Sequence, residues 1–213
     1  MVLAATEDET LLRAWQGGDS AAGAALFDRH HDALVRFFRN KVDDAHRDDL
    51  IQQTFLAAQS AGFAGKSAVR TWLIAIAWRR LSDYFRAESR LSKRHAAFGE
   101  VSVADMGQSP ETHYVQRQER RLLLEGLRQV SLHQQVVLEL HYWEEMSGTD
   151  IARALELPLG TVKTRLRDGR LALERVLVRI AASDRLLQST LDDLDAWAVR
   201  ARAAAGLAED PGE

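Results

Sequence analysis

The sequence predicts an all-α protein: two small helical domains (an N-terminal helix bundle and a C-terminal helix-turn-helix domain), a flexible linker between them, and a C-terminal helical extension. Only three prolines occur in 213 residues, so few positions interrupt a helix. Apolar residues recur three and four positions apart over most of the chain, as on one face of a helix. Between about residues 88 and 112 this period fades and Gly, Ser and Pro become frequent. We therefore expect domains at 1–90 and 115–180, a linker at 91–114 and an extension at 181–213.

The first domain contains four predicted helices. We expect the first to start at Asp8 or Thr10, the second to carry apolar residues through 25–38, the third to start near Asp48, and the fourth to cover 69–86. Gly17-Gly18 ends the first helix, and Gly62 and Gly65 interrupt the chain before the fourth.

Composition excludes several classes of protein. The chain has no cysteine, which excludes disulfides and thiolate zinc sites. No apolar run approaches the roughly 18 residues of a membrane span, and the acidic start does not resemble a secretory signal, so we expect a cytoplasmic protein. The seven histidines are scattered, and His30-His31 is interpreted as a surface pair. Because no nucleotide-binding or hydrolase motif occurs either, we expect no enzymatic activity, no metal and no cofactor.

Basic residues concentrate in two stretches, although the formal net charge is only -3. Two separate basic segments suggest two contacts with a polyanion. On charge alone, two solvated helix faces would explain them better. The stretches are Arg79, Arg80, Arg86, Arg90, Lys93 and Arg94, and Lys163, Arg165, Arg167, Arg170, Arg175 and Arg179.

The second stretch follows a pattern typical of a helix-turn-helix. Residues 147–155 form a short amphipathic helix, residues 156–160 interrupt it, and a long helix follows from Thr161. At 100° per residue, the apolar positions of the long helix share one side and should be buried; they are Val162, Leu166, Leu173 and Val176. Lys163, Thr164 and Arg167 lie roughly opposite, with Arg165 beside them. Such side chains on the first turns suit phosphate anchoring and base reading in the major groove.

The predicted helix at 69–86 is apolar on two sides, so it should pack inside a bundle. One stripe is different: Trp72, Arg79, Asp83 and Arg86 recur at helical spacing. Aromatic, cationic and acidic groups on one stripe can stack on unpaired bases and hydrogen-bond to them.

Three segments resemble the extracytoplasmic-function (ECF) sigma factors of RNA polymerase. Residues 138–166, with Gly160-Thr161-Val162-Lys163-Thr164-Arg165, resemble region 4, which recognises the minus-35 element. Residues 48–58 (Asp48-Asp49-Leu50-Ile51-Gln52-Gln53-Thr54-Phe55-Leu56-Ala57-Ala58) resemble region 2.2, which docks on the polymerase. Residues 71–86 resemble regions 2.3 and 2.4, which melt and read the minus-10 element.

The resemblance implies a function, partners and site residues. It implies a sigma factor that binds core RNA polymerase, directs initiation at specific promoters and is controlled by an anti-sigma factor. The implied polymerase contacts are Asp49, Gln52, Gln53 and Leu56. The implied minus-10 contacts are Trp72, Arg79, Asp83 and Arg86, and the implied minus-35 contacts are Lys163, Thr164, Arg165 and Arg167. The alternative is a helix-turn-helix regulator that binds DNA alone.

Three residues depart from the family pattern. Arg79 stands where the family often has asparagine, Glu156 where it usually has glycine, and Asp168 where it commonly has a basic residue. If Glu156 adopts a left-handed backbone conformation, it costs about 1 kcal/mol. Asp168 should repel nearby phosphate.

The resemblance does not extend to the last thirty or so residues. Leu187, Leu191, Leu194, Ala198 and Ala201 form an apolar seam there, with Asp192, Asp193 and Asp195 away from it. We expect this helix to pack back on the second domain; a built-in regulator is the second interpretation.

Overall fold

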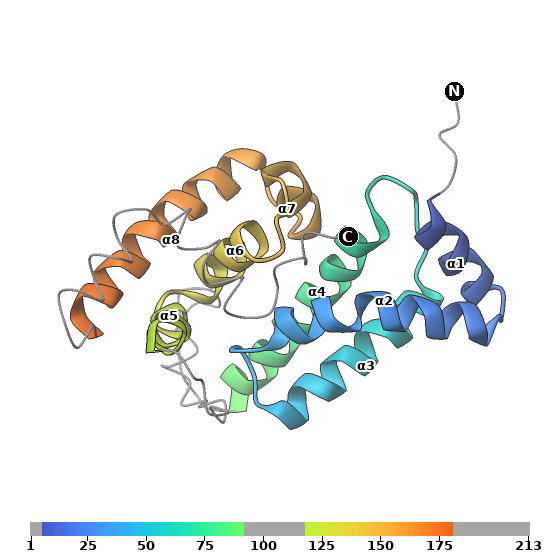
Figure 1. Cartoon of the computed structure of the whole chain (residues 1–213), viewed down its shortest axis with the longest axis horizontal. Coiled ribbons are helices and arrows are strands. Elements are labelled where there is room, and N and C mark those ends of the chain that lie inside the picture. The colour runs from blue at the N-terminus through green and yellow to red at the C-terminus, as the bar shows by residue number, and fades with distance from the viewer. Residues whose placement is uncertain (1–5, 92–117, 181–213) are drawn as a thin grey trace, which may run out of the picture. The chain divides into compact units, whose positions relative to one another are not determined.

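The computed structural model describes residues 6–91 and 118–180, and in these ranges it contains eight α-helices and no strand (Figure 1). The all-α prediction is therefore confirmed. The predicted linker from residue 92 onward and the predicted extension at 181–213 lie outside the described residues. The chain forms two compact units. The first comprises the first four helices together with Asp150–Leu157, and the second comprises the fifth, sixth and eighth helices.

In the first unit, side-chain caps set where three helices begin. The helices are α1 (Glu7–Gln16), α2 (Ser20–Phe38), α3 (Asp44–Ser60) and α4 (Val69–Leu91). Thr6, Asp19 and Asp43 each accept hydrogen bonds from backbone N–H groups of the first turn that follows. The cap at Asp43 starts α3 four residues before the predicted Asp48. At its other end, α4 continues to Leu91, beyond the predicted end at residue 86.

The core of the first unit joins all four of its helices. Its buried side chains are Leu12, Leu26, Ala58, Val69, Leu73 and Ile76. The indole of Trp15 lies directly over Gly23, where an added Cβ would come within 2.3 Å of the ring, so α1 approaches α2 at a position that only glycine allows. The side-chain amide of Gln16 donates to the backbone oxygens of Ala58 and Ala61, each at 2.9 Å. These contacts fix α1 against the end of α3.

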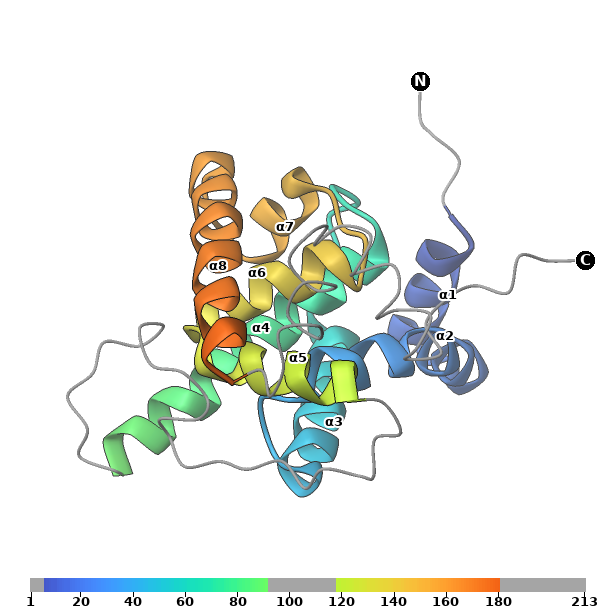
Figure 2. The ribbon, with the colours of Figure 1, turned by 60° about the vertical axis from the view of Figure 1, so that its left-hand side comes forward.

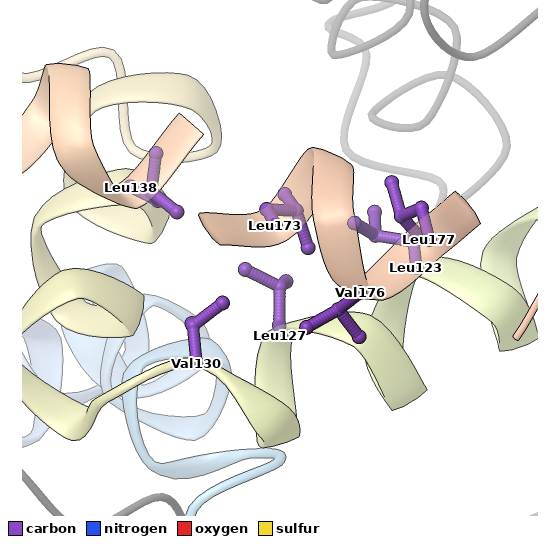
Figure 3. Packing of buried hydrophobic residues seen from close by; sticks show 7 residues of the cluster. All are labelled: Leu123, Leu127, Val130, Leu138, Leu173, Val176 and Leu177. Atoms are coloured by element: carbon purple, nitrogen blue, oxygen red, sulfur yellow. The ribbon is translucent and has the colours of Figure 1, made fainter. Parts of the chain in front are cut away.

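The second unit packs α8 (Leu159–Ile180) against α5 (Gln118–Gln129) and α6 (Leu132–Tyr142), as Figure 2 shows. Figure 3 shows its core: Leu123, Leu127, Val130, Leu138, Leu173, Val176 and Leu177. Gly126 lets α5 approach α8, because a Cβ there would lie 2.9 Å from Leu177. A capping box of Ser131 and Gln134 starts α6.

Candidate protein and nucleic-acid interfaces

The outer face of α3 carries the four residues predicted to contact polymerase. Asp49, Gln52, Gln53 and Leu56 are all exposed and recur at helical spacing, so they form one stripe. The opposite face of α3 is buried, at Leu50, Thr54 and Ala58. Thr54 satisfies its hydroxyl by donating to the Leu50 carbonyl at 2.7 Å. The stripe is therefore free to meet a partner without disturbing the core.

An aromatic hollow of about 420 Å³ borders this stripe, between α2 and α3. Its lining includes two stripe residues, Gln52 and Leu56, and consists in full of Trp15, Phe27, His31, Asp48, Ile51, Gln52, Phe55 and Leu56. The rings of Phe27 and Phe55 lie 4.8 Å apart. Leu56 and Phe27 remain 59% and 39% exposed, which is unusual for large apolar side chains.

His31 was expected on the surface, but the sequence did not indicate that His31 and Phe27 line a hollow. Their spacing of four places them on the same face of α2, and that spacing was the available signal. Only the packing of α2 on α3 brings them beside Gln52 and Leu56.

The minus-10 stripe predicted on α4 is partly exposed and internally paired. Arg79, Asp83 and Arg86 are exposed, whereas Trp72 is half-buried. The guanidinium of Arg86 donates to the Asp83 carboxylate at 3.2 Å. The indole of Trp72 makes an edge-on contact with Phe63, their ring centres 5.2 Å apart. Phe63 belongs to the loop of residues 61–68, so this aromatic pair anchors the loop on α4.

The four predicted minus-35 residues lie on the first turns of α8. Lys163, Thr164 and Arg167 are exposed, and Arg165 is half-buried. Val162, Leu173 and Val176 are buried as predicted, and Leu166 is half-buried. The guanidinium of Arg167 donates to the neighbouring Asp168 carboxylate at 3.0 Å. The acidic departure at Asp168 thus partly neutralises a cation on the predicted DNA-facing surface.

Arg165 is charged but partly removed from solvent. Burial lowers the pKa of its guanidinium. Burial, together with the charge of Arg165, lowers the pKa of His133 on α6 to about 4. At neutral pH His133 is therefore uncharged, and Arg165 meets no second cation from that helix.

The turn before α8 contains a strained residue. Between α7 (Gly148–Ala154) and α8, Leu157 donates its backbone N–H to Ala152, and Glu156 has a φ of 55°. That left-handed conformation favours glycine, because a Cβ crowds the neighbouring carbonyl. Glu156 therefore has the left-handed conformation for which the sequence analysis expected a cost of about 1 kcal/mol.

One histidine interpretation is wrong. His30 is 7% exposed, not on the surface, and its Nε2 lies 2.9 Å from an Asp8 carboxylate oxygen. Burial lowers the pKa of His30, and Asp8 opposes this effect. The sequence could not place His30 because its burial depends on α1 covering α2.

Two features are absent from the described residues, 6–91 and 118–180. No three His, Asp or Glu side chains in these ranges come together as metal ligands would. Among the helices of the same ranges, none has the length and apolar character needed to cross a membrane.

Comparisons with known proteins identify the family of the two regions. Residues 26–91 match the family sigma-70 region 2, and residues 120–173 match sigma-70 region 4. The ECF RNA polymerase sigma factor SigK of Mycobacterium sp. (strain JLS) is 28% identical over 176 residues, 81% of this chain and 91% of that protein. SigK of Mycobacterium tuberculosis (strain H37Rv) is 27% identical over 176 residues, 79% of this chain and 92% of that protein.

Two solved structures share the fold. CnrH, in complex with the cytosolic domain of CnrY, is 23% identical with a TM-score of 0.59, over 82% of this chain and 99% of that chain. RpoE from Bartonella quintana, in complex with the anti-sigma factor NepR, is 18% identical with a TM-score of 0.50, over 81% and 94%.

Regions 2 and 4 in this order define an initiation factor of the sigma-70 type. The chain belongs to the ECF RNA polymerase sigma factors. Its function is to direct RNA polymerase to promoters.

Proposed function

We propose that the outer stripe of α3 and the aromatic hollow beside it form the docking surface for core RNA polymerase. The observation that carries this proposal is the exposure of Leu56 next to Phe27 and Phe55. Apolar side chains in the centre of an interface lose water when a partner binds, and a polar rim fixes orientation. Asp49, Gln52 and Gln53 supply that rim.

The stripe of α4 receives the minus-10 element in this proposal. The exposed edge of Trp72 offers a stacking surface for an unpaired base, and Arg79 supplies positive charge for the backbone. Asp83 and Arg86 bind one another, so the pair presents a donor and an acceptor side by side to a base edge. The loop of residues 61–68, anchored through Phe63, would hold a base that leaves the stack.

The start of α8 reads the minus-35 element. Lys163 and Arg167 are exposed cations suited to phosphate contact, and Thr164 can hydrogen-bond to a base or a phosphate. The half-burial of Arg165 restricts its side chain, which favours a base-reading role because less rotamer freedom is lost on binding.

The remaining assignments follow from this function. We place the protein in the cytoplasm, with no enzymatic activity of its own, and with region 2 at residues 1–90 and region 4 at 115–180. An anti-sigma factor is a proposed partner, because the fold-related RpoE was solved with NepR. The hollow on α3 borders the polymerase surface, so a partner seated there would block docking.

Binding to promoter duplex with and without core polymerase tests the proposal against the alternative of a stand-alone regulator. A sigma factor should bind duplex weakly alone and gain at least about tenfold in apparent affinity when core enzyme is added. Tight, sequence-specific binding by the chain alone, unchanged by core enzyme, would support the stand-alone regulator instead. The double variant Gln52→Lys, Leu56→Lys should lose the gain while keeping the weak intrinsic binding.

A further inference from the structure

Arg79 stands at the centre of the stripe on α4 that comprises Trp72, Arg79, Asp83 and Arg86. Trp72 precedes it by seven residues and Arg86 follows it by seven, and all four positions fall within about 60° around the helix axis. The side chain of Arg79 is 62% exposed. Its guanidinium is therefore accessible to a ligand that approaches this side of α4.

The charges beside Arg79 favour a base edge over the DNA backbone. The guanidinium of Arg86 donates to the Asp83 carboxylate at 3.2 Å, so these two charges offset one another and Arg79 carries the net positive charge of the stripe. Asp83 follows Arg79 by four residues, which places a carboxylate one turn away on the same side of the helix. A carboxylate repels phosphate, whereas it accepts hydrogen bonds from a base.

The structure shows which kind of ligand the Arg79 guanidinium takes. It donates to the carboxylate of Glu156, which belongs to the same compact unit. A carboxylate presents two acceptor oxygens side by side. Because both side chains are mostly exposed, the ion pair contributes little to stability. Another group with two adjacent acceptors can therefore replace the carboxylate.

Guanine is the base whose edge offers two adjacent acceptors in this way. Its O6 and N7 lie side by side, and the planar fork of a guanidinium donates to both at once. On the corresponding edge adenine pairs its N7 with an amino donor, cytosine presents an amino donor, and thymine has a single carbonyl acceptor beside a methyl group. An amino donor on the base would face a donor on Arg79, so the other bases lose one or both hydrogen bonds.

Trp72 and Arg79 are too far apart along α4 to serve the same base. Seven residues of helix rise about 10 Å, whereas successive nucleotides of one DNA strand lie about 3.4 Å apart. A strand that stacks one base on Trp72 and follows the stripe therefore brings a different base to Arg79.

We propose that Arg79 selects guanine at one position of the minus-10 element by donating from its guanidinium to O6 and N7 of that base. The inference rests on the proposed role of the α4 stripe and adds a base preference to it. The positive charge of Arg79 still favours DNA in general, and its fork of donors determines which base is preferred.

Binding of the holoenzyme to a set of promoters tests this selection. The promoters carry each of the four bases in turn at every position of the minus-10 element. Wild-type holoenzyme should favour guanine at one position by about fivefold or more over the other three bases, as one bidentate contact does. The absence of any position with a guanine preference would overturn the inference.

Arg79→Asn should change the preferred base at that same position from guanine to adenine, because a side-chain amide pairs with N6 and N7 of adenine. Arg80→Asn is the matched control. It removes the same charge from the adjacent residue, which points about 100° away around the helix, so it should leave the preferred base unchanged. Guanine still preferred by Arg79→Asn, or lost equally in Arg80→Asn, would show that Arg79 does not select the base.

Two further variants separate failure of this inference from failure of the proposed minus-10 surface. Asp83→Ala and Arg86→Ala change exposed positions, so the fold should be retained. If either alters the response to minus-10 substitutions while Arg79→Asn does not, the surface stands and guanine selection by Arg79 is wrong. If none of the three variants alters that response at any position, α4 does not read the element and both proposals are wrong.

Discussion

Asp8 on α1 and His30 on α2 form a hydrogen bond, with 2.9 Å between a carboxylate oxygen and Nε2. The other carboxylate oxygen of Asp8 accepts from Arg29 at 3.0 Å. His30 is almost fully buried, so this bond satisfies a polar group that has left water. Through these two hydrogen bonds Asp8 holds α1 against α2.

Replacing Asp8 with alanine should therefore destabilise the protein by about 1–3 kcal/mol, because His30 keeps its burial but loses its partner. Thermal unfolding of the full chain measures this as a lower melting temperature. Asp32→Ala is the matched control, since the Asp32 side chain is 84% exposed beside His31 and should change stability little. Equal melting temperatures for both variants would remove Asp8 from the stabilising contacts.

Glu156→Gly should stabilise the turn before α8 by about 1 kcal/mol, because glycine adopts the φ of 55° without a crowded Cβ. Glu156→Ala is the control: it removes the carboxylate but keeps the Cβ, so it should give no such gain. The difference between the two variants in chemical denaturation isolates the backbone effect. If both variants behave alike, the left-handed conformation does not strain this residue.

Placing lysine at both Asp49 and Gln53 should weaken binding to core polymerase by about tenfold or more, because two cations then replace the polar rim of the α3 stripe. Co-purification with core enzyme measures the loss. Asp32 lies on α2 outside the hollow, so the control variant Asp32→Lys should bind core polymerase normally. A folded double variant with unchanged binding would exclude this surface.

Acid should destabilise the second unit through His133. The pKa of His133 is about 4 in the folded protein and about 6.5 in an unfolded chain, so the unfolded state takes up the proton first as the pH falls. The stability from the uncharged ring is complete above about pH 6.5 and is lost progressively toward pH 4. His133→Gln should therefore reduce the loss between pH 7 and pH 5 by about 1 kcal/mol, after allowance for partial solvent exposure.

Melting temperatures at the two pH values provide that measurement, with His141→Gln as an exposed control. Burial also lowers the pKa of His30, so the variant His133→Gln should remove only part of the stability loss in acid. An unchanged response in His133→Gln would mean that this ring is protonated equally in both states.

The sequence predicted the helical architecture because apolar spacing alone determines which face of a helix is buried. Val162, Leu173 and Val176 on α8 are buried as that spacing predicted, and Leu50, Thr54 and Ala58 form the buried face of α3. The predicted helix starts were less accurate. At α3 the start is set by the hydrogen bond that Asp43 accepts, which lies in a polar stretch where apolar spacing gives no signal. The pairing of Asp8 with His30 and the hollow beside Phe27 depend on packing between helices, which no periodicity within one segment reveals.

The departures from the family pattern could be located but not interpreted from sequence. The structure gives Glu156 its left-handed backbone and pairs Asp168 with Arg167. The roles of the exposed residues on α3, α4 and α8 stay predictions, because exposure permits a contact without identifying the partner.

Run-off transcription with core polymerase on a mapped promoter is the most direct test of the central claim that this chain positions polymerase through the start of α8. Wild-type protein should give a single start site. Arg165→Ala should lose about 1–3 kcal/mol of promoter affinity and the discrimination at one base pair, whereas Lys163→Ala should weaken all sequences alike and flatten the salt dependence. Normal transcription by both variants, with unchanged base preference, would contradict the claim.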